Sequence, residues 1–341
     1  MKTTQKIDFV VPWVDGSDPE WIKLYNYYRP EKPISDRGRF RNWEIFRYWF
    51  RAVEQYAPWV NKVYLITNGT FPKWINPECP KLVMVRHEDY IPKQFLPTFS
   101  SHTIELNMDK IPGLSEHFVY FNDDVFLNAP TKPEDYFVDG LPCDCNVETL
   151  FALPWYDSIN RFSVRIVNYC DIAVINQHFD RKKTLRQAPM KWLGSHVWNK
   201  SFFSTLLLSL LGSGGFCSFK MRHREQPFLK SVIQEVWTKE TDMLAASCTR
   251  FRQDVSLNQY LFRYWQFASN KFHPERYNTG KVLNLSTSSV EEACQLISQG
   301  KIRSICLNDT PYCTEESSSL IEMQLIETFK RKFPQKSIFE K

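Results

Sequence analysis

The sequence lacks the cysteine patterns of metal-binding and redox proteins. It contains nine cysteines, but none of them form a Cys-x-x-Cys pair. The closest spacing, Cys143-x-Cys145, suits neither a zinc site nor a thioredoxin-type motif. We therefore expect reduced thiols in a cytoplasmic protein. The first six residues are polar and lead directly into an apolar segment, so no signal peptide is expected.

Long apolar runs, long basic runs, internal repeats and low-complexity tracts are also missing. The longest apolar stretch, 202–211, is interrupted by Ser204, Thr205 and Ser209 and has about half the length needed to cross a bilayer. We expect a buried helix there, with a membrane-facing or lid segment as the alternative. The net charge of +5 without dense Lys/Arg runs argues against nucleic-acid binding. It favours anionic small molecules or an anionic membrane surface.

The composition is that of a globular protein. Hydrophobic residues make up 43% and charged residues 24% of the 341 positions, and the 15% aromatic content is high. This length can bury a large core in one elaborate domain or in two closely joined ones. Three parts are expected: 1–130 with acidic motifs, a looser insertion or acceptor-side segment at 131–215, and 216–341, which packs with the first part as one catalytic domain.

The order of apolar patterns predicts an α/β fold. Short continuous apolar segments at 7–14, 63–67, 82–85 and 118–121 are typical of strands covered on both faces. Between them, 43–57 has the three-to-four spacing of an amphipathic helix, and a helix starting at Ser100 or Ser101 is expected to reach about Lys110, with Glu105 near its positive end. Alternating strands and helices favour a mostly parallel sheet with flanking helices.

Two acidic motifs follow predicted strands. Asp123 and Asp124 come after the strand at 118–121, and Asp15 and Asp18 follow the first strand. Parallel strands carry their sites at their carboxyl ends, so these acids are expected at one rim of the sheet. Adjacent carboxylates repel each other, which favours a bound cation. A strand-end turn in which the acids only cap backbone groups is the alternative.

Three further residues could complete a catalytic set. Hard oxygen ligands select Mg²⁺ or Mn²⁺, and Arg252 offers a fork that matches phosphate oxygens. His223 suits proton removal from a hydroxyl, and its flanking cations are expected to favour the neutral imidazole. A surface ion pair for Arg252, a structural role for His223 and a turn role for Asp309 stay open. The basic cluster 181–183 is expected to be a solvated face.

Four segments resemble the conserved regions of the Stealth proteins, the sugar-phosphate transferases of bacterial capsule synthesis and of lysosomal-enzyme tagging. The first is IDFVVPWVDGSDP at 7–19, and the second runs in pieces through 39–60, 96–105 and 113–124. The third and fourth are 223–254 and 306–309. Pro12 stands where the family usually has Thr, and Asn42-Trp43 replaces a more polar pair.

The resemblance implies a Rossmann-like or GT-A-like nucleotide-sugar-binding architecture and transfer of a hexose 1-phosphate from a nucleotide sugar, expected to be UDP-linked, to a saccharide hydroxyl. It implies the following roles: Asp15, Gly16 and Asp18 at the donor site, Asp123, Asp124 and Asp309 as ligands of Mg²⁺ or Mn²⁺, and His223, Arg252 and Asp309 in catalysis. The expected acceptor is a lipid-linked oligosaccharide, which would place a cytoplasmic enzyme beside the inner face of the membrane.

Two other functions compete with this interpretation. A metal-dependent glycosyltransferase uses a similar acidic motif but releases UDP instead of UMP. A non-catalytic saccharide-binding protein would use the tryptophans as stacking platforms, but the clustered acids argue against it because stacking needs aromatic and neutral polar groups.

Overall fold

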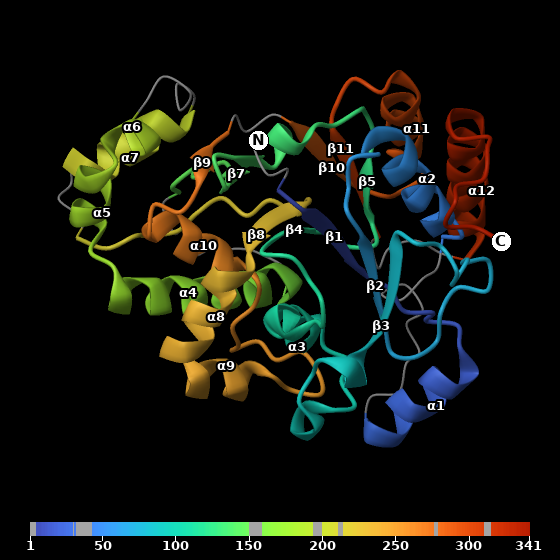
Figure 1. Cartoon of the computed structure of the whole chain (residues 1–341), viewed down its shortest axis with the longest axis horizontal. Coiled ribbons are helices and arrows are strands. Elements are labelled where there is room, and N and C mark those ends of the chain that lie inside the picture. Colours follow the sequence, from blue (N-terminus) through green and yellow to red (C-terminus); the bar gives the residue numbers. More distant parts are fainter. Residues whose placement is uncertain are drawn as a thin grey trace.

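The computed structural model describes residues 5–29, 31, 43–149, 159–193, 200–210, 214–275, 279–309 and 315–341. Positions 39–42, with part of the second resemblance segment and Asn42, lie outside them. Strands form a central five-stranded sheet in the order β3 (Leu82–Arg86), β2 (Val63–Thr67), β1 (Ile7–Pro12), β4 (His117–Tyr120) and β8 (Gln226–Leu229). The first four strands are parallel and β8 is antiparallel to β4 (Figure 1). The predicted α/β class with a mostly parallel sheet is confirmed.

The strand order places a switch point beside β1. The sequence β3-β2-β1-β4 matches half of a doubly wound sheet, in which the connections change direction between β1 and β4. Strand β2 is buried along its whole length, and β1 is buried up to Pro12, which explains their continuous apolar runs. Asp8 is the polar exception, and its carboxylate accepts hydrogen bonds from Asn61, Lys62 and Ser115.

A second sheet continues from the central one. It has three strands in the order β10 (Gly280–Asn284), β11 (Ser304–Asn308) and β5 (Val125–Leu127). Strand β11 is parallel to β10 and antiparallel to β5. The apolar residues on either side of the 123–124 acids therefore belong to two strands, β4 and β5, in two different sheets. Phe121 and the three polar residues 122–124 form the link between these strands.

A small third sheet lies at the other end of the molecule. It consists of β6 (Phe137–Val138), β7 (Leu141–Asp144) and β9 (His273–Pro274). Asp144 is buried at the end of β7, where Arg263 donates to it from Nε at 2.6 Å and from Nη2 at 3.0 Å. Arg222 adds a third bond at 3.1 Å. Buried ion pairs thus tie the 131–215 segment to the carboxyl-terminal part.

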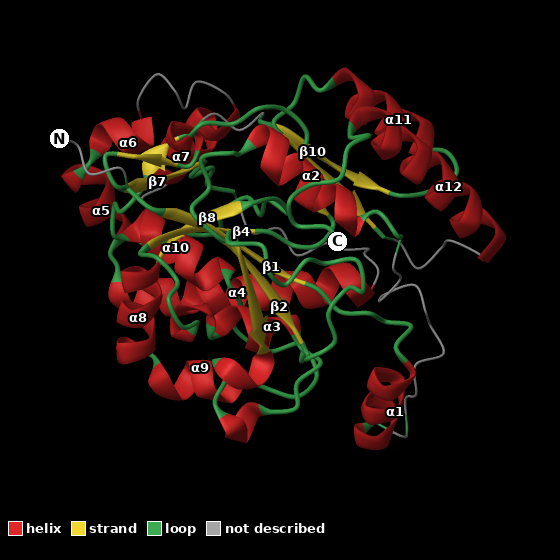
Figure 2. Ribbon diagram, turned by 45° about the vertical axis from the view of Figure 1, so that its right-hand side comes forward, coloured by secondary structure: helices red, strands yellow, loops and turns green. Residues whose placement is uncertain are grey.

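Helices cover both faces of the central sheet (Figures 1 and 2). One side carries α2 (Phe46–Tyr56), and α1 (Pro19–Tyr28) lies below. Helices α11 (Val290–Gln299) and α12 (Glu315–Lys332) lie beside the second sheet, where Phe329 of α12 packs on Tyr48 of α2 and Phe126 of β5. The other side carries α3 (Ser101–Leu106), α4 (Ile159–His178), α8 (Lys230–Lys239), α9 (Thr241–Ser247) and α10 (Tyr260–Ala268). At the periphery lie α5 (Arg181–Gln187), α6 (Pro189–Leu193) and α7 (Lys200–Leu210).

Two helix predictions are corrected. The helix that begins at Ser101 ends at Leu106 and is followed by a separate 3-10 turn at Met108–Lys110, so it does not run on to Lys110. Glu105 therefore lies in the last turn of α3, not near its positive end. Residues 202–210 of the apolar stretch 202–211 lie in α7, and position 211 lies outside the described residues. Leu206, Leu207 and Leu210 of this helix are exposed instead of buried.

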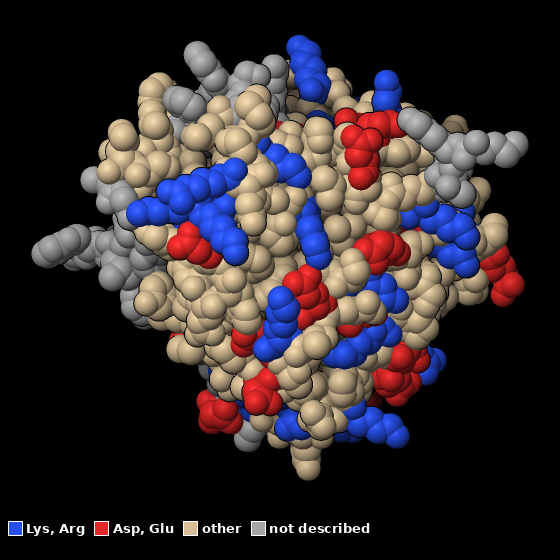
Figure 3. Space-filling view, turned by 60° about the vertical axis from the view of Figure 1, so that its left-hand side comes forward, with Lys and Arg blue, Asp and Glu red and all other residues tan. Residues whose placement is uncertain are grey.

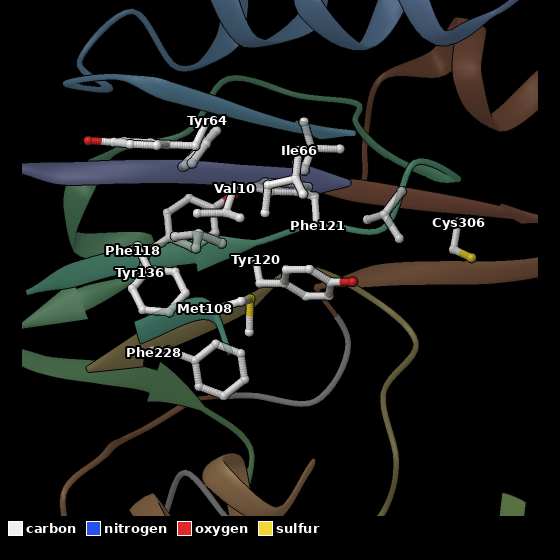
Figure 4. Close-up of a cluster of buried hydrophobic side chains, with 14 of the residues drawn as sticks. Val10, Tyr64, Ile66, Met108, Phe118, Tyr120, Phe121, Tyr136, Phe228 and Cys306 are labelled. Atoms are coloured by element: carbon white, nitrogen blue, oxygen red, sulfur yellow. The ribbon is translucent and has the colours of Figure 1, made fainter. Parts of the chain in front are cut away.

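Aromatic side chains fill the core beside the sheet. Phe9 of β1 and Phe121 lie with ring centroids 4.7 Å apart, and Trp49 of α2 packs edge-on against Phe121 at 5.4 Å. Tyr120 is part of this buried cluster, and in the view of Figure 4 its hydroxyl lies at the end of the ring toward Cys306. A large apolar core therefore supports the residues that follow β4.

Within the described parts of the chain, no helix combines the length and apolar character needed to cross a membrane. The cysteines of these parts are free thiols, which agrees with the reduced state expected from their spacing. Burial raises the pKa of Cys143 to about 12 and that of Cys145 to about 11, so neither thiol is activated as a nucleophile.

Candidate active site

The acidic motif lies where the two sheets meet. Strand β4 ends at Tyr120, a turn follows in which the Val125 N–H donates to the carbonyl of Asn122 at 3.1 Å, and β5 begins. Leu307 of β11 donates its N–H to the carbonyl of Asp124 at 2.9 Å. The side chains of Asp123 and Asp124 are thus held at the carboxyl end of β4, next to the switch point of the central sheet.

Strand β8 brings His223 to this motif. Its antiparallel pairing with β4 sets Tyr120 opposite Gln226, so the residues just before β8 run past the end of β4. His223 Nε2 lies 3.2 Å from Asp124 Oδ2, and Asn122 Nδ2 lies 3.4 Å from each ring nitrogen. The imidazole side chain stays 44% exposed. A histidine on an acidic motif, open to solvent on one side, is suited to exchange a proton with a bound substrate.

The charges around His223 differ from the expectation. Its sequence neighbours Arg222 and Arg224 are buried and turn away from it to pair with Asp144 and Glu225. Burial lowers the pKa of His223, but the charge and hydrogen bond of Asp124 outweigh it, so the pKa is raised above its ordinary value. The expectation that flanking cations favour the neutral imidazole is therefore wrong.

The two aspartates of the motif have different electrostatic properties. Desolvation and the charge of Asp124 raise the pKa of Asp123 to about 7, although solvent contact screens part of the repulsion. Desolvation also acts to raise the pKa of Asp124, but His223 and the Cys306 thiol bind its ionised form and lower the pKa below its ordinary range. Asp124 is thus the constant charge of the pair, and Asp123 is the carboxylate that gains most from a counter-charge.

Glu105 is a buried acid of this site that the sequence analysis did not identify as functional. It lies in the last turn of α3, and its Oε1 is 3.3 Å from the Tyr120 hydroxyl, which is 2.9 Å from Asn122 Oδ1. Burial raises the pKa of Glu105 to about 7, against the opposing charges of Arg252 and His223. A polar chain thus connects Glu105 through Tyr120 and Asn122 to His223. Its place at the end of a short helix gave no sequence signal.

Arg252 lies at the Glu105 end of this chain. Its Nη2 donates to the hydroxyl of Ser101, and its charge acts on Glu105. The side chain is exposed, and it reaches the site from the loop that precedes α10. The charges of Arg252 and His223 both act on Glu105. The catalytic role of Arg252 stays a prediction.

Strand β11 places Asp309 and Cys306 near the motif. Cys306 pairs with Val125 in the antiparallel register, and its thiol lies 3.3 Å from Asp124 Oδ2. Burial and the charge of Asp124 raise the pKa of Cys306 well above its ordinary range, so the thiol keeps its proton and donates it to the carboxylate. Asp309 directly follows the last residue of β11, Asn308, and its role as a metal ligand stays a prediction.

The turn after β1 uses its acids to begin helix α1. Asp15 Oδ1 accepts from the N–H of Ser17 at 2.9 Å and from its hydroxyl at 2.6 Å, and Gly16 lies within this turn. Asp18 caps α1 through Glu20 N at 3.0 Å and accepts from Thr70 at 2.8 Å. These contacts are capping roles. The turn nevertheless follows β1, directly beside β4, so it borders the same rim.

The donor set of the motif fits a hard divalent cation. Asp124 Oδ1 is buried and has no hydrogen-bond partner among the described residues, while Asp123 is adjacent to it and repelled by it. Atoms of Asp124, His223 and Cys306 that could bind a metal lie within 4.8 Å of one another. The protonated thiol of Cys306 is a poor ligand for Mg²⁺ or Mn²⁺ and instead orients Asp124. The aspartate oxygens are the ligands that such an ion prefers.

Two protein-family models match this chain. Stealth protein conserved region 1 matches residues 5–33, and conserved region 2 matches residues 39–143. The first two regions of the sequence resemblance are therefore confirmed. The third and fourth regions, which contain His223, Arg252 and Asp309, are not covered by these two models and stay predictions.

Curated relatives match almost the whole chain. The capsular polysaccharide phosphotransferase WcwK of Streptococcus pneumoniae is 38% identical over 340 residues, which cover 98% of this chain and 99% of the relative. The exopolysaccharide phosphotransferase cps2G of Lactiplantibacillus plantarum is 39% identical over 337 residues, with coverage of 98% and 96%. Among solved structures, a match to the galactosyltransferase LgtC covers 95% of this chain and 95% of LgtC. Its TM-score of 0.39 and its 6% sequence identity are too low to support a functional conclusion.

Proposed function

Because the chain belongs to the family of Stealth-type polysaccharide phosphotransferases, we propose that it transfers a hexose 1-phosphate from a UDP-linked sugar to a saccharide hydroxyl. The family makes it a phosphotransferase enzyme of capsular or exopolysaccharide synthesis. The observation that carries the finer proposal is the 3.2 Å contact between His223 Nε2 and Asp124 Oδ2 at the switch point of the sheet. It combines a candidate base with an acidic motif suited to a diphosphate-bound cation.

His223 is the proposed general base. It takes the proton of the acceptor hydroxyl, whose oxygen attacks the β-phosphorus of the donor. The new bond joins this oxygen to phosphorus, and the bond between the β-phosphorus and the bridging oxygen breaks, so UMP leaves with that oxygen. Asp124 stabilises the imidazolium that forms, in the way that a carboxylate supports a catalytic histidine.

Arg252 and a cation held by the acidic motif are proposed to neutralise the negative charge of the donor's diphosphate. The guanidinium of Arg252 is exposed and can bind the phosphoryl oxygens as the bridging bond breaks. Asp123, Asp124 and Asp309 would hold Mg²⁺ or Mn²⁺, which supplies charge neutralisation at the diphosphate when bound. The Asp15–Asp18 turn, including Gly16, would border the nucleotide sugar from the end of β1.

The decisive experiment identifies which phosphorus-containing products the reaction forms. The protein is incubated with UDP-GlcNAc, UDP-GalNAc or UDP-galactose and a short capsule oligosaccharide, standing for the lipid-linked acceptor, with and without EDTA. We expect a new phosphodiester signal in ³¹P NMR, release of UMP, and loss of both with EDTA. Release of UDP would instead identify a glycosyltransferase, and metal-independent binding without any product would identify a saccharide-binding protein.

Replacement of the proposed base provides the matched test. His223→Ala should lower turnover by at least about 10²-fold while donor affinity stays within about twofold, because the base acts on the acceptor proton. His273→Ala removes an exposed histidine in β9, remote from the motif, and should retain full activity. Substantial turnover of the His223 variant would exclude the role as base, whereas the family activity itself would be tested by the NMR assay.

A further inference from the structure

Helix α7 carries its apolar stripe on the outside. Leu206, Leu207 and Leu210 have exposed fractions of 37%, 46% and 76%, and Phe203, one turn earlier, is 70% exposed. These positions are spaced by three and four residues and therefore share one face of the helix. On the inward face, Thr205 and Leu208 are 1% and 2% exposed. A helix that only covered the core would have the opposite orientation.

A buried ion pair holds this orientation. Arg181 of α5 is 1% exposed and donates to both carboxylate oxygens of Glu148, at 2.7 and 2.8 Å. The same guanidinium donates to the carbonyl of Thr205 at 3.1 Å and to the hydroxyl of Ser209 at 3.2 Å. Arg181 is therefore not part of a solvated basic face, as its sequence cluster indicated. It binds the polar side of α7 and so directs the leucines outward.

Exposed cations and further apolar side chains lie on the neighbouring helices α5 and α6. On α6, which packs against α7, Met190 is 72% and Leu193 36% exposed. Lys182, Lys183 and Arg186 of α5 are exposed. The views agree that α5, α6 and α7 lie together at one end of the molecule (Figures 1 and 2), and Figure 3, which brings that end forward, shows Lys and Arg side chains gathered beside an uncharged area.

The local sequence is predominantly basic, although the exposed Asp180 caps α5 at its start. From 181 to 210 it has six basic residues and no Asp or Glu; the basic residues are Arg181, Lys182, Lys183, Arg186, Lys191 and Lys200. Glu148, the acid that Arg181 binds, is fully buried. Exposed leucines beside exposed cations are the two components of an interfacial helix, which inserts its apolar side chains between lipids while its cations contact anionic headgroups.

We propose that α5, α6 and α7 form a surface that docks on an anionic lipid bilayer, with the leucines of α7 inserted into the headgroup region. The surface is separate from the proposed catalytic residues, and its binding does not require a nucleotide sugar. It would keep the enzyme at the plane of the membrane. If the proposed acceptor is lipid-linked, docking would also restrict the search for it to two dimensions.

Vesicle flotation of the whole chain tests the proposal without any substrate. We expect binding to vesicles of phosphatidylcholine with phosphatidylglycerol, weaker binding to phosphatidylcholine alone, and release by salt. The triple variant Leu206→Gln, Leu207→Gln, Leu210→Gln should reduce partitioning by more than about tenfold, because it removes the inserted side chains. Replacing Lys182, Lys183 and Arg186 by Gln should cause a loss of about the same size on anionic vesicles only.

The control variants carry equivalent changes elsewhere. Leu320, Met323 and Ile338 are 45%, 59% and 48% exposed near the carboxyl end, and their replacement by Gln should leave vesicle binding unchanged. Replacement of Lys330, Arg331 and Lys336, which are exposed there, is the matched control for the cations. Circular dichroism confirms that each variant is folded.

Three outcomes would overturn the proposal: no binding of the unmodified protein to anionic vesicles, equal losses in the α7 and control variants, or self-association that the leucine variant removes while vesicle binding is absent. The last result would assign the surface to a second copy of the chain. Because vesicle binding needs no donor or acceptor, its failure would leave the proposed phosphotransfer reaction untouched.

Discussion

The pKa of the buried Glu105 carboxyl is set by its burial and by the charges of the candidate site around it. It is 6% exposed, lies near the rings of Tyr90 and Tyr120, and faces the charges of Arg252 and His223. Asp171 lies close enough for the two acids to repel each other. Burial is the dominant influence, so the folded protein prefers a protonated Glu105 at pH values where the unfolded chain has already lost this proton.

The consequence is a pH-dependent loss of stability. The pKa of Glu105 is raised from 4.5 to about 7, so its contribution to the free energy of unfolding falls as the pH rises through this window, and the penalty is complete above pH 7. The Glu105→Gln variant has no such penalty, because the glutamine side chain does not ionise. We expect the variant to gain about 2 kcal/mol relative to the unmodified protein between pH 5 and pH 8, measured by urea unfolding at several pH values.

The matched control for this prediction is Glu327→Gln. Glu327 is 60% exposed and pairs with Arg331 on the surface of α12, so its replacement should give a difference in stability that does not change over the same pH range. Parallel pH curves for the Glu105 variant and the unmodified protein would show that Glu105 ionises normally in the folded state.

At the scale of elements, the strands were predictable and the contacts between them were not. The burial of both faces leaves a local apolar signature in β1, β2 and β4, and acids at their carboxyl ends were expected at one rim from topology alone. The polar residues 122–124 mark the end of the predicted strand at 118–121, but no local signal shows that the apolar residues after them, β5, belong to a different sheet. The roles of Glu105 and Cys306 depend on partners that are more than a dozen residues away in the sequence. The charge around His223 depends on its neighbour Arg222, which turns away from it to pair with Asp144.

Asp8 illustrates an acid whose role is to hold elements together. At the amino end of β1 it accepts hydrogen bonds from Asn61 Nδ2 at 2.7 Å, Lys62 N at 3.1 Å and Ser115 N at 2.8 Å, which join β1 to the segments that lead into β2 and β4. Asp8→Ala leaves these donors without their acceptor, so we expect a loss of about 3 kcal/mol in the free energy of unfolding.

Chemical unfolding measures this loss of stability. Binding of the nucleotide sugar to the folded variant should be normal, because Asp8 lies at the amino end of β1 and the candidate site lies at the carboxyl ends of the strands. Asp242→Ala, at an exposed position in the first turn of α9, is the comparison and should cost less than about 0.5 kcal/mol. A loss of similar size for both variants would mean that the hydrogen bonds of Asp8 are replaced by water.

At the scale of the whole molecule, the buried ion pairs of Asp144 predict cooperative unfolding. Arg263 and Arg222 bind this carboxylate from segments that follow the 131–215 insertion, and together they hold its pKa below the ordinary range despite burial. We propose that the insertion and the rest of the chain unfold as one unit. Asp144→Asn should lower the free energy of unfolding by about 3–5 kcal/mol, because it leaves two buried guanidinium groups with reduced compensation.

Calorimetry and fluorescence should then report a single coincident transition for the unmodified protein, shifted to lower temperature in the variant. Asp139→Asn, a change at an exposed position in the turn between β6 and β7, should shift the transition temperature little. Two separated transitions in the unmodified protein would show that the insertion is an independent domain, as the looser pattern of its sequence also allows.

The position of β11 between β10 and β5 determines when the candidate active site can form during synthesis. Among the strands of the described residues, β11 is the last to leave the ribosome, yet it occupies the middle of its sheet and supplies the thiol that orients Asp124. Until it emerges, β5 and β10 have unpaired edges, and the acidic motif lacks one of its supports. A nascent chain can assemble the central sheet early, because β8 is already available, whereas the completed site appears only near the end of translation.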